Sequence, residues 1–207
     1  MKIIIVGAAD IFDLASIVHG PTGGQIVGYC GLAPIATSRY ADFPFLGDDL
    51  KNAHSVHPEA AFLLALSNNI RRRELTAEVA QFGGRILSAI HPAATIFPTS
   101  RLGRGVVVQP GVIISTLGCV EDGVYLNYGA LVGHDVRVGA FSFISPGARL
   151  LGEVQVGADV FVGSNAVIHP RVRIGDGAKI AAGAQVHRNV PRGATVMLEQ
   201  KTRILGM

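Results

Sequence analysis

The residues with the clearest chemical character lie near the middle of the chain, where Asn127 is followed seven residues later by the pair His134 and Asp135. A carboxylate beside an imidazole can hold the ring in one tautomer and make it more basic, as a general base working near neutral pH requires. The spacing alone equally allows an ordinary exposed histidine in a turn. His134 is therefore a candidate base, and Asp135 is the candidate acid that orients it.

Other residue types that often carry chemistry do not form a recognisable site in the sequence. Cys30 and Cys119 have no metal-ligand spacing and sit in apolar stretches, so we predict buried free thiols in a reducing compartment. The remaining histidines share no metal spacing either. We therefore predict no bound metal. These histidines are His19, His54, His57, His91, His169 and His187.

A repeat indicates which elements position His134. From Ile90 to Pro191 the chain divides into seventeen blocks of six residues without an insertion, and each block opens on an aliphatic residue. A helix has a period of about 3.6 residues and a half-exposed strand a period of about 2, so neither explains this pattern. A period of six predicts a β-helix, in which each block is one short strand and stacked blocks bury a continuous core. The opening residues are Ile90, Ile96, Leu102, Val108, Ile114, Val120, Leu126, Val132, Val138, Ile144, Leu150, Val156, Val162, Ile168, Ile174, Ile180 and Val186.

Composition indicates ample core and a surface with few charges. Of the 207 residues, 49% are hydrophobic and 16% are charged, which favours association with other copies. The net charge of +3 is too small to predict nucleic-acid binding. The apolar run after Lys2 is too short for a signal peptide, and no segment is long enough to cross a bilayer. We expect no membrane insertion and a cytoplasmic location.

Residues 1–89 have a different pattern, in which apolar runs alternate with segments of helical character. This alternation predicts a small α/β domain of Rossmann type, whose strand-to-helix turns gather at one edge, the usual place for a ligand. The chain then divides into this domain (1–89), the β-helix (90–191) and a C-terminal tail (192–207). We expect strands at 2–6, 25–30, 60–66 and 85–89, and helices from Asp10 to His19, from Asp48 or Asp49 to His54, and over 69–82.

The turn after the first expected strand is a candidate ligand contact. Its sequence GAAD, at 7–10, lacks the further glycines of a dinucleotide-binding fingerprint. Gly7 and Ala8 could cradle a phosphate of the substrate, or they could form a simple tight turn. The sequence does not decide between these two interpretations.

The repeats resemble those of the hexapeptide-repeat acyltransferases. The stretch LNYGALVGHD at 126–135 is similar to the corresponding stretch of bacterial sugar acetyltransferases, which include sialic-acid O-acetyltransferases and nucleotide-amino-sugar N-acetyltransferases. Similar, too, are IHPAA at 90–94, SPGA at 145–148 and GAQV at 183–186, and the small N-terminal domain matches in order and length. The resemblance implies a left-handed parallel β-helix with three hexads per coil, a homotrimer, and acetyl-CoA as co-substrate.

The resemblance also implies roles for residues at matching positions of the repeat. His134 becomes the base, Asp135 its orienting acid and Asn127 a contact on the sugar side, while Ala182 and Gly183 fall where the coil contacts coenzyme A.

Two further roles follow from the family pattern. With three hexads per coil, Gly152 lies directly above His134 at about 5 Å, and its N–H could donate to the thioester carbonyl. In the N-terminal domain, Asn69 and Arg72 match an Asn-x-x-Arg element that approaches the nucleotide.

We therefore predict an acetyl-CoA-dependent N-acetyltransferase acting on a nucleotide-linked amino sugar. His134 acts as general base in a direct transfer, because no serine or cysteine pairs with it to form an acyl-enzyme. Two alternatives stay open. One is O-acetylation of a free sugar of the sialic-acid type, with the same base and a hydroxyl nucleophile. The other is a non-catalytic β-helix that binds a ligand or acts as a scaffold for a partner.

Overall fold

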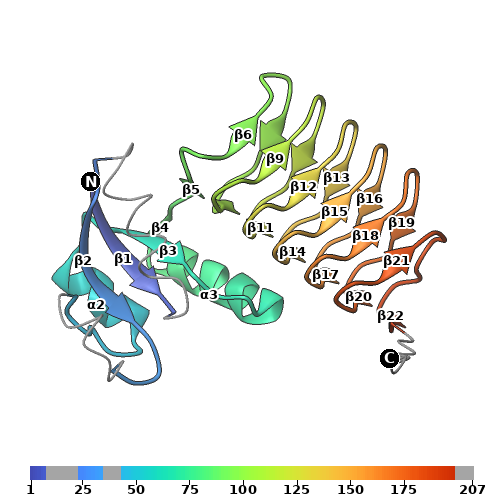
Figure 1. The fold of residues 1–207 in the computed structure, drawn as a ribbon. Helices are drawn as coiled ribbons and strands as arrows, with labels where there is room; N and C mark the ends of the chain where they lie inside the picture. The colour runs from blue at the N-terminus through green and yellow to red at the C-terminus, as the bar shows by residue number, and fades with distance from the viewer. Residues whose placement is uncertain (8–22, 35–42, 199–207) are drawn as a thin grey trace, which may run out of the picture.

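The computed structural model describes residues 1–7, 23–34 and 43–198, which form two packed parts (Figure 1). An N-terminal sheet with helices, coloured blue to green, lies beside a solenoid coloured green to red. The helix expected between Asp10 and His19, the candidate residue Ala8, and the final residues 199–207 lie outside the described residues.

The N-terminal sheet has four parallel strands in the order β2-β1-β3-β4. Residues 3–6 of β1 are buried, as expected for an apolar strand that is covered on both faces. The chain continues to β2 on one side of β1 and to β3 on the other, so the carboxyl ends of β1 and β3 form the switch point at which open α/β sheets bind ligands. The bounds are β1 (Lys2–Val6), β2 (Gln25–Cys30), β3 (Ala61–Leu64) and β4 (Arg85–Ile86).

Two helices cover the side of this sheet that faces away from the solenoid. Helix α2 (Leu50–Val56) is capped by Asp49, whose carboxylate accepts a hydrogen bond from the Asn52 amide at 2.9 Å. Helix α3 (Asn69–Gln81) is capped by the side chain of Asn68. Both helices start where the sequence predicts, although α2 continues two residues past His54.

The solenoid consists of two-residue strands arranged in three parallel sheets, here called faces I, II and III. Each strand pairs with the strand 18 residues further on, as in Leu131↔Arg149 and Arg149↔Val167, so one coil contains three hexads as predicted. Face I comprises β5 (Ala89–Ile90), β8 (Val107–Val108), β11 (Tyr125–Leu126), β14 (Phe143–Ile144), β17 (Phe161–Val162), β20 (Lys179–Ile180) and β22 (Thr195–Val196). Face II comprises β6 (Thr95–Ile96), β9 (Ile113–Ile114), β12 (Leu131–Val132), β15 (Arg149–Leu150), β18 (Val167–Ile168) and β21 (Gln185–Val186). Face III comprises β7 (Arg101–Leu102), β10 (Cys119–Val120), β13 (Arg137–Val138), β16 (Gln155–Val156) and β19 (Arg173–Ile174).

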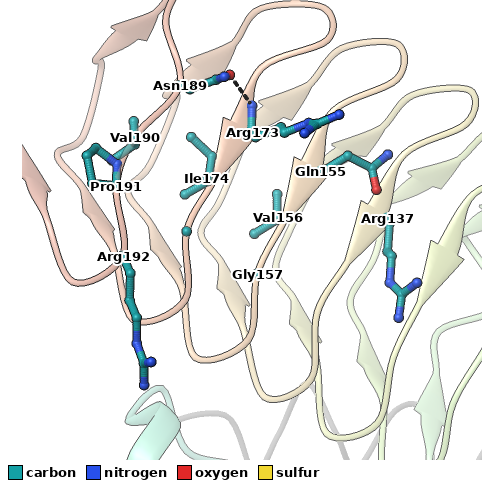
Figure 2. Close-up of a pocket in the computed structure, with 11 residues that line it drawn as sticks. Arg137, Gln155, Val156, Gly157, Arg173, Ile174, Asn189, Val190, Pro191 and Arg192 are labelled. Atoms are coloured by element: carbon teal, nitrogen blue, oxygen red, sulfur yellow. Dashed lines mark hydrogen bonds between the residues drawn. The ribbon is translucent and has the colours of Figure 1, made fainter.

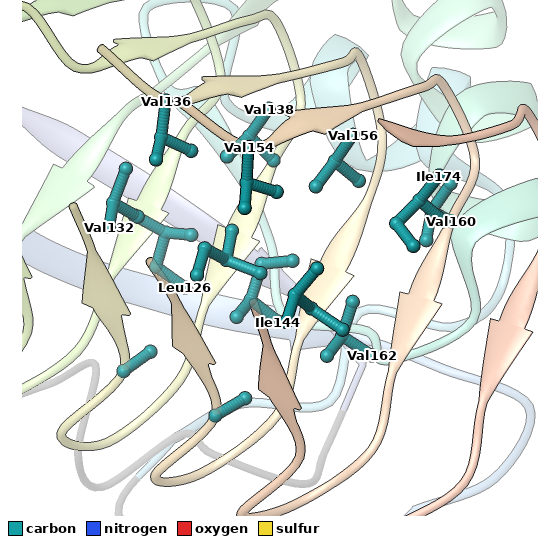
Figure 3. Packing of buried hydrophobic residues seen from close by; sticks show 14 of the residues in the cluster. Leu126, Val132, Val136, Val138, Ile144, Val154, Val156, Val160, Val162 and Ile174 are labelled. Atoms are coloured by element: carbon teal, nitrogen blue, oxygen red, sulfur yellow. The ribbon is translucent and has the colours of Figure 1, made fainter. Parts of the chain in front are cut away.

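The opening aliphatic residues of the hexads point into the solenoid and form its core, together with the small residues at the fifth positions (Figure 3). Those from Val108 onward are almost fully buried, and each such side chain contributes about 1.5–3 kcal/mol of transfer free energy. Ile90 remains 38% exposed because no coil lies below it.

The repeat departs from the sequence prediction at both ends. The expected fourth strand at 85–89 ends at Ile86, because Ala89 pairs with Val107 and starts the solenoid. At the other end the solenoid does not stop at Pro191. Thr195 pairs with Lys179 in a last coil that is two residues shorter than the others, so part of the expected tail belongs to the β-helix.

One side of the N-terminal sheet packs against face I. The outward residues Val107, Tyr125 and Phe143 are buried in one hydrophobic cluster with Ile5 and Leu63 of the sheet. The apolar side chains of this row point outward from face I, and the N-terminal sheet shields them from water. Faces II and III have no such cover within the described part of the chain.

Candidate active site

His134 and Asp135 lie in the turn between β12 and β13, at the corner where face II meets face III. The Nδ1 atom of His134 is 2.9 Å from Oδ2 of Asp135. An ionised carboxylate only accepts hydrogen bonds, so Nδ1 donates and Nε2 is left as the basic nitrogen. The two side chains are 59% and 48% exposed, so a substrate or a second chain has access to this pair.

Gly152 occupies the adjacent coil, as the 18-residue register predicts. A Cβ atom added at Gly152 would overlap the Nε2 and Cε1 atoms of His134, so the imidazole lies over the glycine and a side chain would displace it. Among the described residues the Gly152 amide has no acceptor, whereas the neighbouring Glu153 amide donates to the His134 carbonyl at 2.9 Å. An N–H group with no acceptor among the described residues therefore lies beside the imidazole, and a group of this kind can serve as an oxyanion donor.

Asn127, Ala182 and Gly183 lie at a different corner from His134. They belong to the turns between faces I and II, before β12 and β21, and His134 follows β12. The Asn127 side chain accepts a hydrogen bond from the Tyr128 amide at 2.8 Å. One chain thus places the two groups of candidate residues at opposite edges of face II, and does not bring them together.

Asn69 and Arg72 do not face an open site. Arg72 is 1% exposed and donates hydrogen bonds to carbonyl oxygens of the solenoid, and Asn69 Nδ2 donates to the Val160 carbonyl at 3.0 Å. The resemblance implies that these side chains approach a nucleotide, but in the structure their contacts join the N-terminal sheet to the solenoid.

Gly7 follows β1 at the switch point of the sheet. Its φ of 95° and its position beside β3, where a Cβ would lie 2.6 Å from the Ala65 carbonyl oxygen, both require glycine. This explains the tight turn physically and leaves the phosphate-binding interpretation open.

Face III carries shallow grooves that the sequence analysis missed, and two of them lie along its C-terminal coils. One groove of about 490 Å³ contains Arg137, Gln155 and Arg173 from successive strands (Figure 2). A second groove of about 690 Å³ is lined by Asp135, Glu153, Arg171 and Arg173, so it adjoins the candidate base. The 18-residue register could have revealed this arrangement, since it aligns Asp135 with positions 153 and 171.

Within the described residues, no group of three or more His, Cys, Asp or Glu side chains is arranged to hold a metal ion. No helix in the same part of the chain is long and apolar enough to span a bilayer.

Comparisons with known proteins agree with this geometry. A family model described as bacterial transferase hexapeptide (six repeats) matches residues 153–188. PerB from Caulobacter crescentus, in complex with CoA and GDP-perosamine, is 29% identical over 94% of this chain and 93% of its own, with a TM-score of 0.85. WeeI from Acinetobacter baumannii AYE shares the fold at 20% identity, over 94% of this chain and 96% of its own, with a TM-score of 0.84.

The acetyltransferase domain of PglB from Neisseria gonorrhoeae FA1090 is 30% identical, over 94% of this chain and 95% of its own, with a TM-score of 0.82. At this coverage the match extends over both the N-terminal sheet and the solenoid. From this identity over nearly the whole of both chains, we conclude that the protein belongs to the hexapeptide-repeat sugar acetyltransferases.

Proposed function

We propose that the chain transfers an acetyl group from acetyl-CoA to the amine of a nucleotide-linked amino sugar. The observation that carries this proposal is the exposed Nε2 of His134, oriented by Asp135 and lying over the free amide of Gly152. The ligands of two relatives support the substrate classes. PerB was solved with CoA and GDP-perosamine, and the PglB acetyltransferase domain was solved with acetyl coenzyme A.

The proposed reaction is a direct transfer. The acceptor amine attacks the thioester carbonyl carbon, and His134 Nε2 takes a proton from the amine as the C–N bond forms. The Gly152 N–H donates to the oxygen on which negative charge develops. The C–S bond then breaks, and the imidazolium returns its proton to the departing thiolate. The products are an N-acetyl sugar and coenzyme A.

The two parts of the chain would hold different ligands. Residues 1–89 act as a Rossmann-like acceptor domain, with Gly7 at the switch point between β1 and β3. Residues 90–191 form the transferase β-helix, with the left-handed winding of the family, and Ala182 and Gly183 contact the coenzyme. The rest, 192–207, forms the last short coil and the tail.

We propose a homotrimer because one chain does not assemble the site by itself. The N-terminal sheet covers face I, whereas His134 lies at the corner of faces II and III, away from that cover. Asn127 and Gly183 lie at the other edge of face II. A cyclic assembly through face II would bring the His134 edge of one chain to the Asn127 edge of the next, and this heterologous contact closes into a ring.

The test is to incubate the purified chain with acetyl-CoA and a panel of nucleotide-linked amino sugars, following thiol release and the mass of the sugar. We expect a gain of one acetyl group on the amino sugar and none on the matched sugar that carries a hydroxyl in place of the amine. Acetylation of the hydroxyl sugar, or of free sialic acid, would replace the proposal with the O-acetyltransferase. If no acceptor gives thiol release or acetyl transfer, the proposal is replaced by the non-catalytic β-helix that binds a ligand or a partner.

A further inference from the structure

The contact between helix α3 and the solenoid follows the same 18-residue register as the coils. Gly123, Phe141 and Asp159 occupy one equivalent position in three successive turns between faces III and I, and all three have a left-handed backbone, with φ between 57° and 66°. The N-terminal half of α3 makes contacts with each of these three turns. We call this set of contacts the joint.

Arg72 lies at the centre of the joint. Its Nε donates to the Gly123 carbonyl at 2.9 Å, and its Nη2 donates to the Phe141 and Ser142 carbonyls at 2.7 and 3.2 Å. On the other side, Nη1 donates to the Leu66 carbonyl at 2.7 Å, two residues after the end of β3. A single guanidinium therefore connects the carboxyl end of a sheet strand to two coils of the solenoid.

Neighbouring residues of α3 extend the joint to the third turn. Arg73 makes a bidentate pair with the Asp159 carboxylate, at 3.1 and 2.7 Å, and its guanidinium lies 4.4 Å from the centre of the Phe141 ring. Asn69 Nδ2 donates to the Val160 carbonyl at 3.0 Å. Three residues within five positions of one helix thus contact three coils in succession.

The surroundings of Arg72 are those of a buried structural cation. Burial lowers the pKa of Arg72 to about 10, while Tyr125 and Asp159 oppose that change, so the guanidinium stays charged at neutral pH. Its charge is met by carbonyl dipoles and by the rings of Tyr125 and Phe143, each 5.9 Å away. A phosphate could reach this guanidinium only if several of these hydrogen bonds broke.

We propose that Arg72 is a positioning residue, which acts through the joint to hold the acceptor-binding sheet at one fixed angle to the solenoid. This inference rests on the proposed function, because it assumes that residues 1–89 carry the acceptor. Arg72 bonds the Leu66 carbonyl in the segment that follows β3, so it holds the chain at the switch-point edge of the sheet, where the acceptor would bind. A change in that angle would move the acceptor amine away from the thioester.

The test compares Arg72→Lys with Arg71→Lys in the full chain. Both replace an arginine by a lysine in the same helix turn, but the Arg71 side chain is 50% exposed and, within the described part of the chain, pairs with Glu74 in its own helix. Lysine keeps the charge at position 72 and loses the planar fork that bonds the Leu66 and Phe141 carbonyls together. Amide hydrogen exchange of α3 and of the turns at 123 and 141 reports on the joint without any need for turnover.

For Arg72→Lys we expect exchange of these amides to rise by roughly tenfold, as local opening becomes easier. We expect the acceptor KM to rise and kcat to fall, each by roughly tenfold, because a displacement of about 1 Å is enough to impair transfer. The KM for acetyl-CoA should stay within about twofold, since that ligand is held elsewhere. Arg71→Lys should match the wild type in every measurement.

Calorimetry with a panel of nucleoside diphosphates separates this role from direct contact with the nucleotide. If Arg72→Lys abolishes diphosphate binding while its exchange pattern stays like the wild type, Arg72 is a ligand contact and the proposal is wrong. Unchanged exchange together with unchanged kinetics would also overturn it. A wild-type chain that acetylates no amino sugar would refute the proposed function and the positioning role with it, while the exchange data would still show whether the joint exists.

A charge exchange at the edge of the joint provides a second test if Arg72→Lys folds poorly. Arg73→Asp and Asp159→Arg should each raise the acceptor KM, and the double variant should recover most of the loss. Arginine is compatible with the backbone at 159, because Arg171 already adopts a left-handed φ of 63°. No recovery in the double variant would mean that the Arg73–Asp159 pair does not maintain the joint.

Discussion

At the scale of single residues, the candidate site depends on a short hydrogen bond between neighbours in the sequence. Asp135 has a left-handed backbone, with a φ of 57°, and its carboxylate bonds the imidazole of the preceding residue. A non-glycine residue in this conformation costs about 1–2 kcal/mol, and such strain often accompanies function. The same residue therefore forms the turn and orients the base.

Replacing the base should slow transfer without weakening coenzyme binding. His134→Ala is expected to lower kcat by about 10²–10⁴-fold, the usual contribution of a positioned general base. Asp135→Asn should cost less, because the base remains and only its orientation and basicity suffer. Steady-state kinetics with both substrates measures this, and His57→Ala, in the N-terminal part, is the control. Wild-type turnover in His134→Ala would show that another group accepts the proton.

The buried thiol of Cys30 should make the fold sensitive to alkaline pH. Burial, reinforced by the charges of Asp49 and Asp48, raises the pKa of Cys30 from 9.0 to about 12. Above pH 9 the unfolded chain loses this proton while the folded chain keeps it, so the contribution to stability is complete below pH 9 and declines toward pH 12. Urea unfolding across this range should show a steeper decline for wild type than for Cys30→Ala. Equal slopes would mean that the thiol titrates alike in both states.

The repeat period of the sequence predicts the positions of some of these residues and misses those of others. It places Gly152 over His134, because a strict period turns a distance along the chain into a distance in space. It does not place Arg72, since three successive arginines at a helix start look equally exposed, and only the packed solenoid shows which of them is buried. The prediction that the Cys119 thiol is buried is also wrong. This residue precedes the inward residue Val120, so it points out from face III and is only partly buried.

At the scale of elements, the three rows of turns differ in their left-handed residues. The turns between faces II and III have side chains at this position, in Leu117, Asp135, Glu153 and Arg171, whereas most turns at the other two corners have glycine. The row that contains the candidate base therefore has strained backbone at positions that carry side chains, and three of these, at 135, 153 and 171, line the second groove on face III.

The stacking of adjacent turns predicts the effect of a single methyl group. The backbone at Gly152 is outside the left-handed region, so Gly152→Ala should fold normally, but its Cβ would push the imidazole of His134 aside. We expect kcat to fall by about 10²-fold with an unchanged thermal midpoint, because the base is displaced and the coil is intact. Adding Gly152→Ala to His134→Ala should have no further effect on kcat. Additive losses in the double variant would show that Gly152 acts independently of the imidazole.

The hexad pattern predicts the strands of the solenoid correctly, but it does not predict where the solenoid begins and ends. It predicts the hexads because every inward position from Val108 to Val186 is aliphatic, and the family resemblance adds that three hexads form one coil. It misses the last coil, because Val190 bridges Ile174 two residues ahead of the regular register. The pattern also cannot show that Ala89 leaves the N-terminal sheet, since a short apolar segment fits either partner.

At the scale of the whole molecule, the three faces differ in their outward residues. Face I carries the apolar row that the sheet covers, and face III carries arginines and shallow grooves. Half of the outward residues of face II are aliphatic, namely Ile113, Leu131 and Val167, and the others are Thr95, Arg149 and Gln185. Ile113 is 42% exposed. Face II, with these uncovered aliphatic side chains between the two edges that carry candidate site residues, is the surface we expect to join the copies of the trimer.

A charge on face II should therefore dissociate the trimer and abolish transfer together. Ile113→Asp places a carboxylate on that face without entering the chain's own core, because the side chain points outward. Light scattering should give about three times 21.7 kDa for wild type and a smaller mass for the variant. Cys119→Asp, at the equivalent strand position on face III, should remain a trimer. A wild-type chain that is monomeric at micromolar concentration would refute the proposed assembly.

The 18-residue register also limits how the length of this chain can change. An insertion of a full coil beyond the joint would only translate the later turns, by about 4.8 Å along the axis. An insertion of one hexad between His134 and Gly152 would rotate every later residue onto the next face. Gly152 would then leave the imidazole, and a different residue would take its place. Changes in length that preserve the site are therefore whole coils inserted outside the stretch from His134 to Gly152.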